Sequence, residues 1–252
     1  MVRDIACKRC GACVEVCPEG AASLNNEDGR KIDWTKCSNC MKCVASCRYQ
    51  SLNVSGRYME VEEVVDEIMR DEDFYRNSGG GVTVSGGEAL AQSNFVAALL
   101  EICQKRGLHT ALDTTGHATW KRMSQALKFA DLILFDVKHL DRQKHKEATG
   151  VSNDLILANL RRVARTKPIW LRMPVIAGFN DSEDYVRQII ALAKAIAVEK
   201  ISLLPYHEGG QSKSLQLGRT YKYPGANSPS DEHVNVLKEL IVAEGINASV
   251  GN

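Results

Sequence analysis

Residues 7–17 have the sequence CKRCGACVEVC, and residues 37–47 have the sequence CSNCMKCVASC. Both stretches follow the pattern C-x2-C-x2-C-x3-C, so every cysteine of the first recurs 30 residues later as an internal repeat. Three thiolates at this spacing can wrap one face of an iron–sulfur cube, while the fourth reaches a neighbouring cube. The repeat therefore predicts two [4Fe–4S] clusters. Their ligands are Cys7, Cys10, Cys13 and Cys47 for one cluster, and Cys37, Cys40, Cys43 and Cys17 for the other.

Two other uses of cysteine fit this pattern less well. A disulfide framework requires an oxidising compartment, and the stretch before Cys7 lacks the apolar core of a secretion signal. A zinc ribbon needs two C-x2-C pairs per metal, which leaves the third and fourth cysteines of each quartet without a role. Arg48 stands where Pro18 follows the first quartet, so the second quartet loses a turn-shaping residue but no ligand.

The overall composition is that of an ordinary globular protein. The 252 residues are 44% hydrophobic and 25% charged, which permits a sizeable core and excludes wholesale disorder. The formal net charge of +1 argues against nucleic acid as a partner. No apolar run approaches the roughly 20 residues that span a bilayer, so we expect no membrane partner. The oxygen-sensitive clusters and the lack of a secretion signal predict a cytoplasmic location.

Past residue 54 the cysteines give way to alternating strand and helix patterns. This change predicts two domains, a small cluster-binding domain at residues 1–54 and a larger one at residues 55–252. Short apolar runs between amphipathic stretches predict five parallel strands joined by helices, fewer than the eight of a closed β/α barrel. The strands are expected at residues 82–85, 109–113, 132–137, 169–175 and 200–204, and the helices near residues 61–69, 94–105, 120–129, 153–165, 182–196 and 231–244.

Polar residues gather where these strands end. Each has a plain structural explanation on its own, as a turn former, a solvated side chain or a surface histidine. The carboxyl ends of parallel strands meet at one rim of a sheet, however, so together these residues predict a polar binding pocket. Cys103 lies apart from them in an expected helix, where it should be a small buried hydrophobe. The pocket residues are Gly86, Gly87, Glu88, Asp113, Thr114, Asp136, Lys138, Arg172 and His207.

Taken together, these motifs resemble those of the activating enzymes of glycyl-radical enzymes. This family lies within the radical SAM superfamily, and the match is to the subgroup with a ferredoxin-like insertion. The resemblance implies an α/β fold, a partial (β/α)6 barrel that binds S-adenosylmethionine (SAM), preceded by a small two-[4Fe–4S] ferredoxin-like domain. The matching stretches follow the family order along nearly the whole chain: the two cysteine quartets and residues 78–88, 113–116, 136–138, 170–181 and 203–209.

The resemblance also assigns roles to the pocket residues. Gly86, Gly87 and Glu88 match the motif that holds the methionine amino group of SAM, and a carboxylate facing an ammonium is chemically apt. Asp136 and Lys138 match the motif that contacts the methionine and ribose portions. Lys138 suits the carboxylate of SAM.

The remaining pocket residues are similar to positions that line the same site. Arg172 and His207 match such positions, and Asp113 and Thr114 belong to another shared motif. Asp113 and Asp136 would bring two carboxylates close to the carboxylate of SAM. Because three like charges repel one another, we expect a monovalent cation among them.

The chemistry implied by the resemblance is one-electron cleavage of SAM. A reduced [4Fe–4S] cluster donates an electron, the C5′–S bond breaks, and the resulting 5′-deoxyadenosyl radical takes hydrogen from a glycine Cα. That glycine belongs to a partner glycyl-radical enzyme. The two clusters of the cysteine quartets would relay electrons, with flavodoxin or ferredoxin as the reductant.

One part of the family pattern does not occur in the 252 residues. Radical SAM chemistry needs a further cluster held by C-x3-C-x2-C, which in the family precedes the ferredoxin-like insertion, and Cys103 is the only cysteine outside the quartets. We therefore expect an N-terminally truncated activating enzyme that is inactive by itself and lacks its first barrel strand. The strand at residues 82–85 would then be an uncovered sheet edge. Two alternatives are an electron-transfer and SAM-binding module, and a docking protein that binds the glycyl-radical enzyme without activating it.

Overall fold

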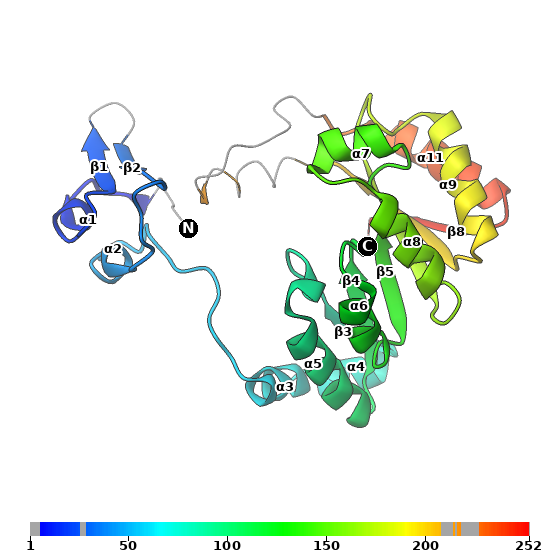
Figure 1. Cartoon of the computed structure of the whole chain (residues 1–252), viewed down its shortest axis with the longest axis horizontal. Coiled ribbons are helices and arrows are strands. Elements are labelled where there is room, and N and C mark those ends of the chain that lie inside the picture. The colour runs from blue at the N-terminus through cyan, green and yellow to red at the C-terminus, as the bar shows by residue number, and fades with distance from the viewer. Residues whose placement is uncertain (1–5, 26–28, 208–213, 215, 218–226, 252) are drawn as a thin grey trace. The chain divides into compact units, whose positions relative to one another are not determined.

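The computed structural model describes residues 6–25, 29–207, 214, 216–217 and 227–251 (Figure 1). The chain divides into two compact units. The first, here called the cysteine unit, comprises Met1–Tyr58 and Glu208–Pro224, and the second, here called the sheet unit, comprises Met59–His207 and Gly225–Asn252. The sequence places the boundary at residue 54 instead, and it assigns the later segment to the larger domain.

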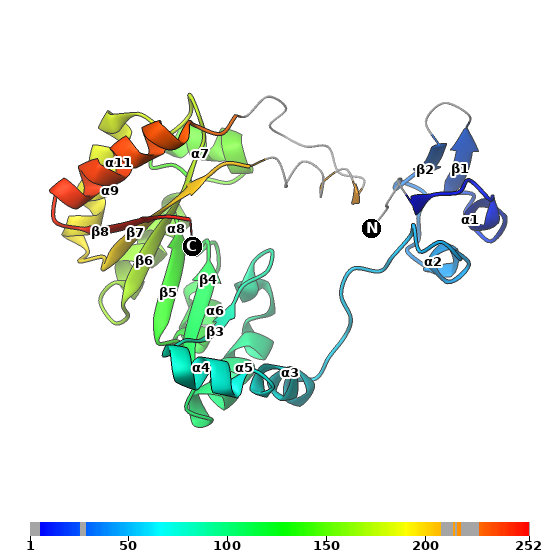
Figure 2. The same cartoon turned by 180° about the vertical axis from the view of Figure 1, so that it is seen from behind.

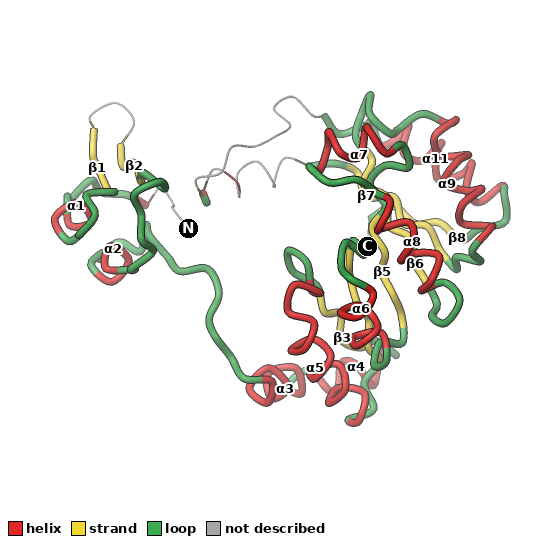
Figure 3. The backbone as a smooth tube through the Cα atoms, in the orientation of Figure 1, coloured by secondary structure: helices red, strands yellow, loops and turns green. Residues whose placement is uncertain are grey.

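The cysteine unit repeats one pattern of loop and helix. In each half, a cysteine loop leads into a single helical turn, α1 (Ala12–Glu15) or α2 (Lys42–Ala45). Between the two halves in sequence, β1 (Ala22–Asn25) and β2 (Gly29–Ile32) pair antiparallel (Figure 3). Few apolar side chains are buried here, and domains of this size gain only a marginal stability from apolar burial. Domains of this size often gain further stability from a bound metal cluster.

The sheet unit contains six parallel strands in the order of the chain (Figure 2). Because neighbours in sequence are also neighbours in the sheet, the carboxyl ends of all six strands lie at one rim. The strands are β3 (Gly81–Val84), β4 (His109–Thr114), β5 (Leu132–Asp136), β6 (Ile169–Val175), β7 (Lys200–Pro205) and β8 (Asn247–Val250). The helices are α3 (Val61–Met69), α4 (Glu72–Ser78), η2 (Ala89–Gln92), α5 (Ser93–Lys105), α6 (Trp120–Leu127), α7 (Arg142–Thr149), α8 (Asp154–Val163), α9 (Glu183–Ala195) and α11 (Asp231–Ala243).

The five predicted strands and six predicted helices are confirmed, with ends that differ by at most two residues. The strand count was too low, because β8 was missed. Its sequence, NASV, holds a single residue that favours strands. Helix α7 was also missed because its sequence, RQKHKEAT, is polar throughout and shows no apolar stripe.

One face of the sheet forms the core of this unit. Ile133 and Phe135 of β5 and Leu171 and Met173 of β6 are fully buried, in a cluster that includes residues of α6, α8, α9 and α11. Side chains alternate between the two faces of a strand, so the residues between these lie on the opposite face. That opposite face carries Asp136, the last residue of β5.

Strand β3 forms one edge of the sheet. It pairs with β4, and among the described residues no strand lies on its other side. Helix α3 packs against α5, and Val82 and Val84 of this strand pack against the same apolar cluster. Apolar packing therefore covers one side of the edge strand, while its outer backbone groups remain without a strand partner in the described structure.

Gly116, in the turn after β4, is expected to tolerate no side chain. Its φ is +70°, and an added Cβ would collide with the ring of the buried Phe135. Gly116→Ala should lower the free energy of unfolding by about 3 kcal/mol, combining a left-handed backbone penalty of about 1–2 kcal/mol with overpacking. Urea unfolding of the variant and the parent chain measures this difference.

Gly107→Ala is the matched control for this prediction. Gly107 has a φ of +77°, but an added Cβ there would meet no atom within 4 Å. It should therefore lose only the backbone penalty of about 1–2 kcal/mol. Equal losses for the two variants would show that the collision with Phe135 contributes nothing.

Candidate functional site

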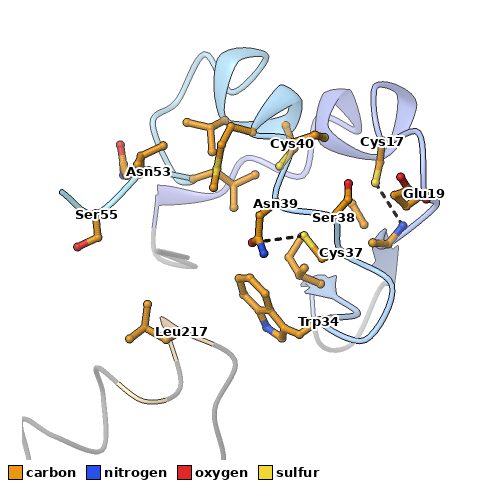
Figure 4. A pocket seen from close by; sticks show the side chains of 18 residues that line it. Cys17, Glu19, Trp34, Cys37, Ser38, Asn39, Cys40, Asn53, Ser55 and Leu217 are labelled. Atoms are coloured by element: carbon orange, nitrogen blue, oxygen red, sulfur yellow. Dashed lines mark hydrogen bonds between the residues drawn. The ribbon is translucent and has the colours of Figure 1, made fainter. Parts of the chain in front are cut away.

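Two cavities in the cysteine unit are lined by cysteine side chains. Each is lined by three cysteines of one quartet and the last cysteine of the other, which is the grouping that the repeat predicts. The larger cavity, of about 380 Å³, is lined by Cys17, Cys37, Cys40 and Cys43 (Figure 4). The smaller cavity is lined by Cys7, Cys10, Cys13 and Cys47.

The repeat is preserved in the backbone as well as in the cysteines. Three pairs of residues, each 30 apart, have positive φ angles: Arg9 and Asn39, Gly11 and Met41, and Gly20 and Gln50. Such left-handed residues in tight turns make concave runs of N–H groups that bind anions. A cluster held by four thiolates is negatively charged, so these turns suit it.

The last cysteine of each quartet receives hydrogen bonds that favour its thiolate. The pKa of Cys17 is lowered, chiefly because backbone N–H groups of Ala22 and Ala21 stabilise the charged form; the Ala21 nitrogen lies 3.2 Å from the sulfur. Burial raises the pKa of Cys47, but the Ser51 hydroxyl and nearby N–H groups outweigh it, so the net pKa is lowered. Thiolates are the form that binds metal.

The third cysteine of each quartet lies in a more enclosed position. Burial is the main reason that the pKa values of the Cys13 and Cys43 thiols are raised. In these positions a metal cluster would replace the thiol proton, because the ligand is the thiolate.

The number and type of donors at each cavity suit a [4Fe–4S] cluster. Among the residues that the structure describes, no three Cys, His, Asp or Glu side chains converge on one ion site. A cube spreads its cysteine ligands around a body of several atoms, so they line a cavity instead of meeting at a point. Four cysteines for each cavity are the donors that a [4Fe–4S] cluster takes.

Glu88 anchors the turn that follows β3. Its carboxylate accepts hydrogen bonds from the Leu90 N–H (3.1 Å), the Thr114 hydroxyl (2.7 Å), the Thr115 N–H (3.0 Å) and the Thr115 hydroxyl (2.6 Å). These bonds tie the end of β3 to the end of β4. Because both carboxylate oxygens are engaged, the side chain positions the turn. The expected approach of this carboxylate to the ammonium group of a ligand stays a prediction.

The two glycines before Glu88 border open space. Gly86 has a φ of +140°, which side-chain-bearing residues rarely adopt. An added Cβ at Gly86 or Gly87 would meet no atom within 4 Å, and both residues are exposed. The backbone of this turn is therefore accessible to a ligand, and the hydrogen bonds of Glu88 fix its position.

Four charged side chains form a network across the ends of β4, β5 and β6. Arg172 donates to Asp113 at 2.6 Å and lies 3.6 Å from Asp136, and Lys138 donates to Asp136 at 2.9 Å. Ser85 also donates to Asp113, at 2.8 Å. The side chains of Asp113, Asp136 and Arg172 are only 16–18% exposed, whereas that of Lys138 is 36% exposed. Two cations thus already balance the two carboxylates.

Two atoms of this network are unsatisfied. Asp136 Oδ1 and Arg172 Nε are buried, and neither makes a hydrogen bond within the described part of the chain. Buried polar atoms in native proteins are nearly always hydrogen-bonded. The two atoms lie 3.6 Å from each other, just beyond hydrogen-bonding distance, so they form an ion pair without a hydrogen bond.

The structure brings most of the predicted pocket residues to this rim. His207 is exposed and lies just beyond β7, the strand next to β6. Cys103 is fully buried in α5, as predicted. The sequence reasoning missed Ser85 and Thr115, although both stand inside the motifs that it singled out. The hydroxyl groups of Ser85 and Thr115 could have indicated this role, because short polar side chains near an acid often donate hydrogen bonds to its carboxylate.

Known proteins share both units of this chain. The family described as the radical SAM superfamily matches residues 36–191, and the 4Fe-4S dicluster domain matches residues 1–59. The 4-hydroxyphenylacetate decarboxylase activating enzyme of Clostridioides difficile strain CD196 is 37% identical over 260 residues, covering 100% of this chain and 82% of that protein. The chain belongs to the radical SAM activating enzymes of glycyl-radical enzymes. Membership implies iron–sulfur clusters and SAM as cofactors, and a glycyl-radical enzyme as partner.

Other members of the activating-enzyme family show similar likeness. The isethionate sulfite-lyase activating enzyme of Nitratidesulfovibrio vulgaris is 42% identical over 221 residues, covering 86% of this chain and 72% of that protein. A crystal structure of a domain of a pyruvate-formate lyase-activating enzyme from Bacteroides vulgatus superposes with a TM-score of 0.58 and 31% identity, covering 69% of this chain and 99% of that one. Streptococcus suis SuiB, at 14% identity and a TM-score of 0.60, shares the fold.

No described helix of the activating enzyme is both long enough and apolar enough to cross a bilayer.

Proposed function

We propose that this chain supplies the SAM site and a two-cluster electron relay for making a glycyl radical on a partner enzyme. The observation that carries the proposal is the crossed arrangement of two cysteine quartets around two cavities. In the family's chemistry, a reduced [4Fe–4S] cluster would supply the electron for cleavage of the C5′–S bond of SAM, and a glycine Cα of the partner would lose a hydrogen atom. Flavodoxin or ferredoxin would deliver electrons to the relay.

The glycine turn would hold the amino group of SAM. Gly86 and Gly87 are exposed and an added Cβ at either would meet open space, and backbone carbonyl oxygens accept hydrogen bonds from an ammonium group. Glu88 keeps the turn in place through its bonds to Thr114 and Thr115. Its negative charge would favour the ammonium group of SAM.

The charged network would hold the rest of SAM. Lys138 is its most exposed member, so it can turn from Asp136 toward the carboxylate of SAM. Asp136 Oδ1 and Arg172 Nε would then find ligand partners for their unsatisfied hydrogen bonds. His207, beyond β7, would line the same site from the next strand.

We also propose that a monovalent cation binds near these carboxylates when SAM is bound. In the structure Arg172 and Lys138 balance Asp113 and Asp136, so the carboxylates alone give no reason for a further cation. The carboxylate of SAM would add a third negative charge and compete for Lys138. With SAM bound, the negative charges would outnumber the positive ones, so a monovalent cation would be favoured. SAM affinity unchanged by replacing K⁺ and Na⁺ with a bulky organic cation would contradict this part.

SAM cleavage requires a cluster that these residues do not hold. The 252 residues contain no C-x3-C-x2-C motif, and both quartets are fully used by the two cavities. The edge of β3 is also unpaired in the described structure, where a further barrel strand would fit. We infer that the chain by itself binds SAM and two clusters but does not cleave SAM.

Anaerobic reconstitution tests the proposed function. The chain should hold about 8 iron and 8 sulfide per molecule and bind SAM in equilibrium dialysis. After reduction with dithionite, chromatography should detect no 5′-deoxyadenosine. Stoichiometric 5′-deoxyadenosine would contradict the inferred requirement for a further cluster, and a chain that takes up iron but not SAM would be an electron-transfer module only.

A further inference from the structure

A buried arginine lies beside one of the two cysteine cavities. Arg30, on β2, is 5% exposed and lines the smaller cavity together with Cys47. Removing a guanidinium from water is unfavourable unless hydrogen bonds or opposite charges compensate. A positive charge placed against four thiol ligands would be compensated by a negatively charged cluster.

Arg30 reaches Cys47 through a serine. Its Nη1 donates to the Ser51 hydroxyl oxygen at 2.5 Å, and its Nη2 donates to the Ser51 carbonyl at 3.2 Å. The Ser51 hydroxyl lies 3.4 Å from the Cys47 sulfur, and Ser51 is 1% exposed. A ligand thiolate has no proton, so in the loaded protein the hydroxyl is the donor to the sulfur.

The other cavity has a different environment at the corresponding position. Ser51 lies 30 residues after Ala21, so the repeat aligns a hydroxyl-bearing residue with one that has none. At Cys17, the counterpart of Cys47, the contact comes from the Ala21 backbone N–H at 3.2 Å. The described residues that line the larger cavity include Glu19 but no lysine or arginine.

This asymmetry has a consequence for electron transfer. Reduction of a [4Fe–4S]²⁺ cluster to [4Fe–4S]⁺ adds one negative charge, which hydrogen bonds to sulfur and nearby positive charge stabilise. The stabilisation is stronger in a buried site, where water screens charges less. The two clusters should therefore differ in reduction potential even though their cysteine ligands are equivalent.

We propose that Arg30 and Ser51 raise the reduction potential of the cluster held by Cys47 above that of the cluster held by Cys17. The proposal rests on the proposed function, in that both quartets must hold [4Fe–4S] clusters. A single electron that enters the pair settles on the Cys47 cluster, and the Cys17 cluster is the harder one to reduce. Arg30 and Ser51 thus act as positioning and tuning residues rather than as ligands.

A redox titration of the reconstituted chain tests the proposal. The protein is poised at a series of potentials with dithionite and mediators, and EPR measures the reduced fraction of each cluster. Two separate one-electron steps are expected. Ser51→Ala should shift only the higher step downward, so that at a fixed potential the ratio of reduced to oxidised cluster falls about tenfold, or about 59 mV.

Three further variants sharpen the test. Ala21→Ser adds the missing hydroxyl beside Cys17 and should raise the lower step. Arg30→Gln should lower the higher step further than Ser51→Ala does, with Arg30→Lys restoring part of the loss. Lys31→Gln is the matched control, because it removes an exposed charge from the same strand and should shift neither step.

The outcomes separate this proposal from the proposed function. A chain that assembles about 8 iron but shows coincident steps, or a higher step that does not respond to Ser51→Ala, overturns the tuning role. A parent chain that assembles no EPR-active clusters overturns the proposed function itself. Should Arg30→Gln fail to fold, Ser51→Ala and Ala21→Ser still decide the matter, since each changes only one hydroxyl.

Discussion

Cys47→Ala is expected to remove the same cluster as Cys10→Ala, although these cysteines belong to different quartets. Both line the smaller cavity, so either change leaves that cluster one ligand short. Each single variant should fall from about 8 to about 4 iron per chain. The double variant Cys10→Ala/Cys47→Ala should also retain about 4, because the second change damages a cluster that is already lost.

The opposite pairing gives the complementary result. Cys17 lines the larger cavity with Cys40, so Cys10→Ala/Cys17→Ala should lose nearly all iron. Iron and sulfide analysis, together with EPR of the reduced protein, makes the measurement. Cys103→Ala is the control, since Cys103 is buried in α5 and lines neither cavity, and it should retain about 8 iron. If Cys10→Ala/Cys47→Ala retained no iron, the two cysteines would belong to different clusters. Each quartet would then hold its own cluster, which contradicts the crossed grouping.

Arg172→Met is expected to disrupt the rim of the sheet and SAM binding together. Arg172 neutralises Asp113 and approaches Asp136, and all three side chains are largely enclosed. Without the guanidinium, Asp113 loses its cation and Asp136 keeps only Lys138. We expect the free energy of unfolding to fall by roughly 3 kcal/mol, because an enclosed charge is left uncompensated. SAM affinity should fall more than tenfold.

Two further variants show whether charge is the cause. Asp113→Asn/Arg172→Met removes the stranded carboxylate and should recover part of the lost stability, which a double-mutant cycle measures. Arg187→Gln removes an arginine from an exposed i,i+4 pair with Glu183 and should change stability by less than about 0.5 kcal/mol. Strictly additive losses for Asp113→Asn and Arg172→Met would contradict the electrostatic account.

Features that repeat or alternate in the sequence were predictable. The quartets specify their own grouping because a spacing of two and three residues fixes which thiols can face one cube. Strands such as β6 were found because strongly apolar residues recur at every second position along them. Asp113, Asp136 and Arg172 were placed at one rim because parallel strands share the direction of their ends.

Features that depend on contacts between distant residues were not predictable. The hydrogen bonds of Glu88 to Thr114 and Thr115 join residues 26 and 27 positions apart, so the sequence did not reveal them. The neutralisation of Asp113 by Arg172 joins residues 59 apart. Likewise, nothing local distinguishes Arg30 from the exposed Lys31 beside it, since only the folded unit buries the one and leaves the other in water.

The crossed arrangement of cysteines around the two cavities also couples cluster binding to the folding of the cysteine unit. Either quartet alone, on an unfolded chain, offers a loop of three close thiols and a fourth that points elsewhere. Both cavities close only when residues 7–17 and 37–47 have come together. The brown colour of the loaded clusters would therefore appear and fade with the tertiary structure of this unit, so that its visible absorbance follows unfolding without any added probe.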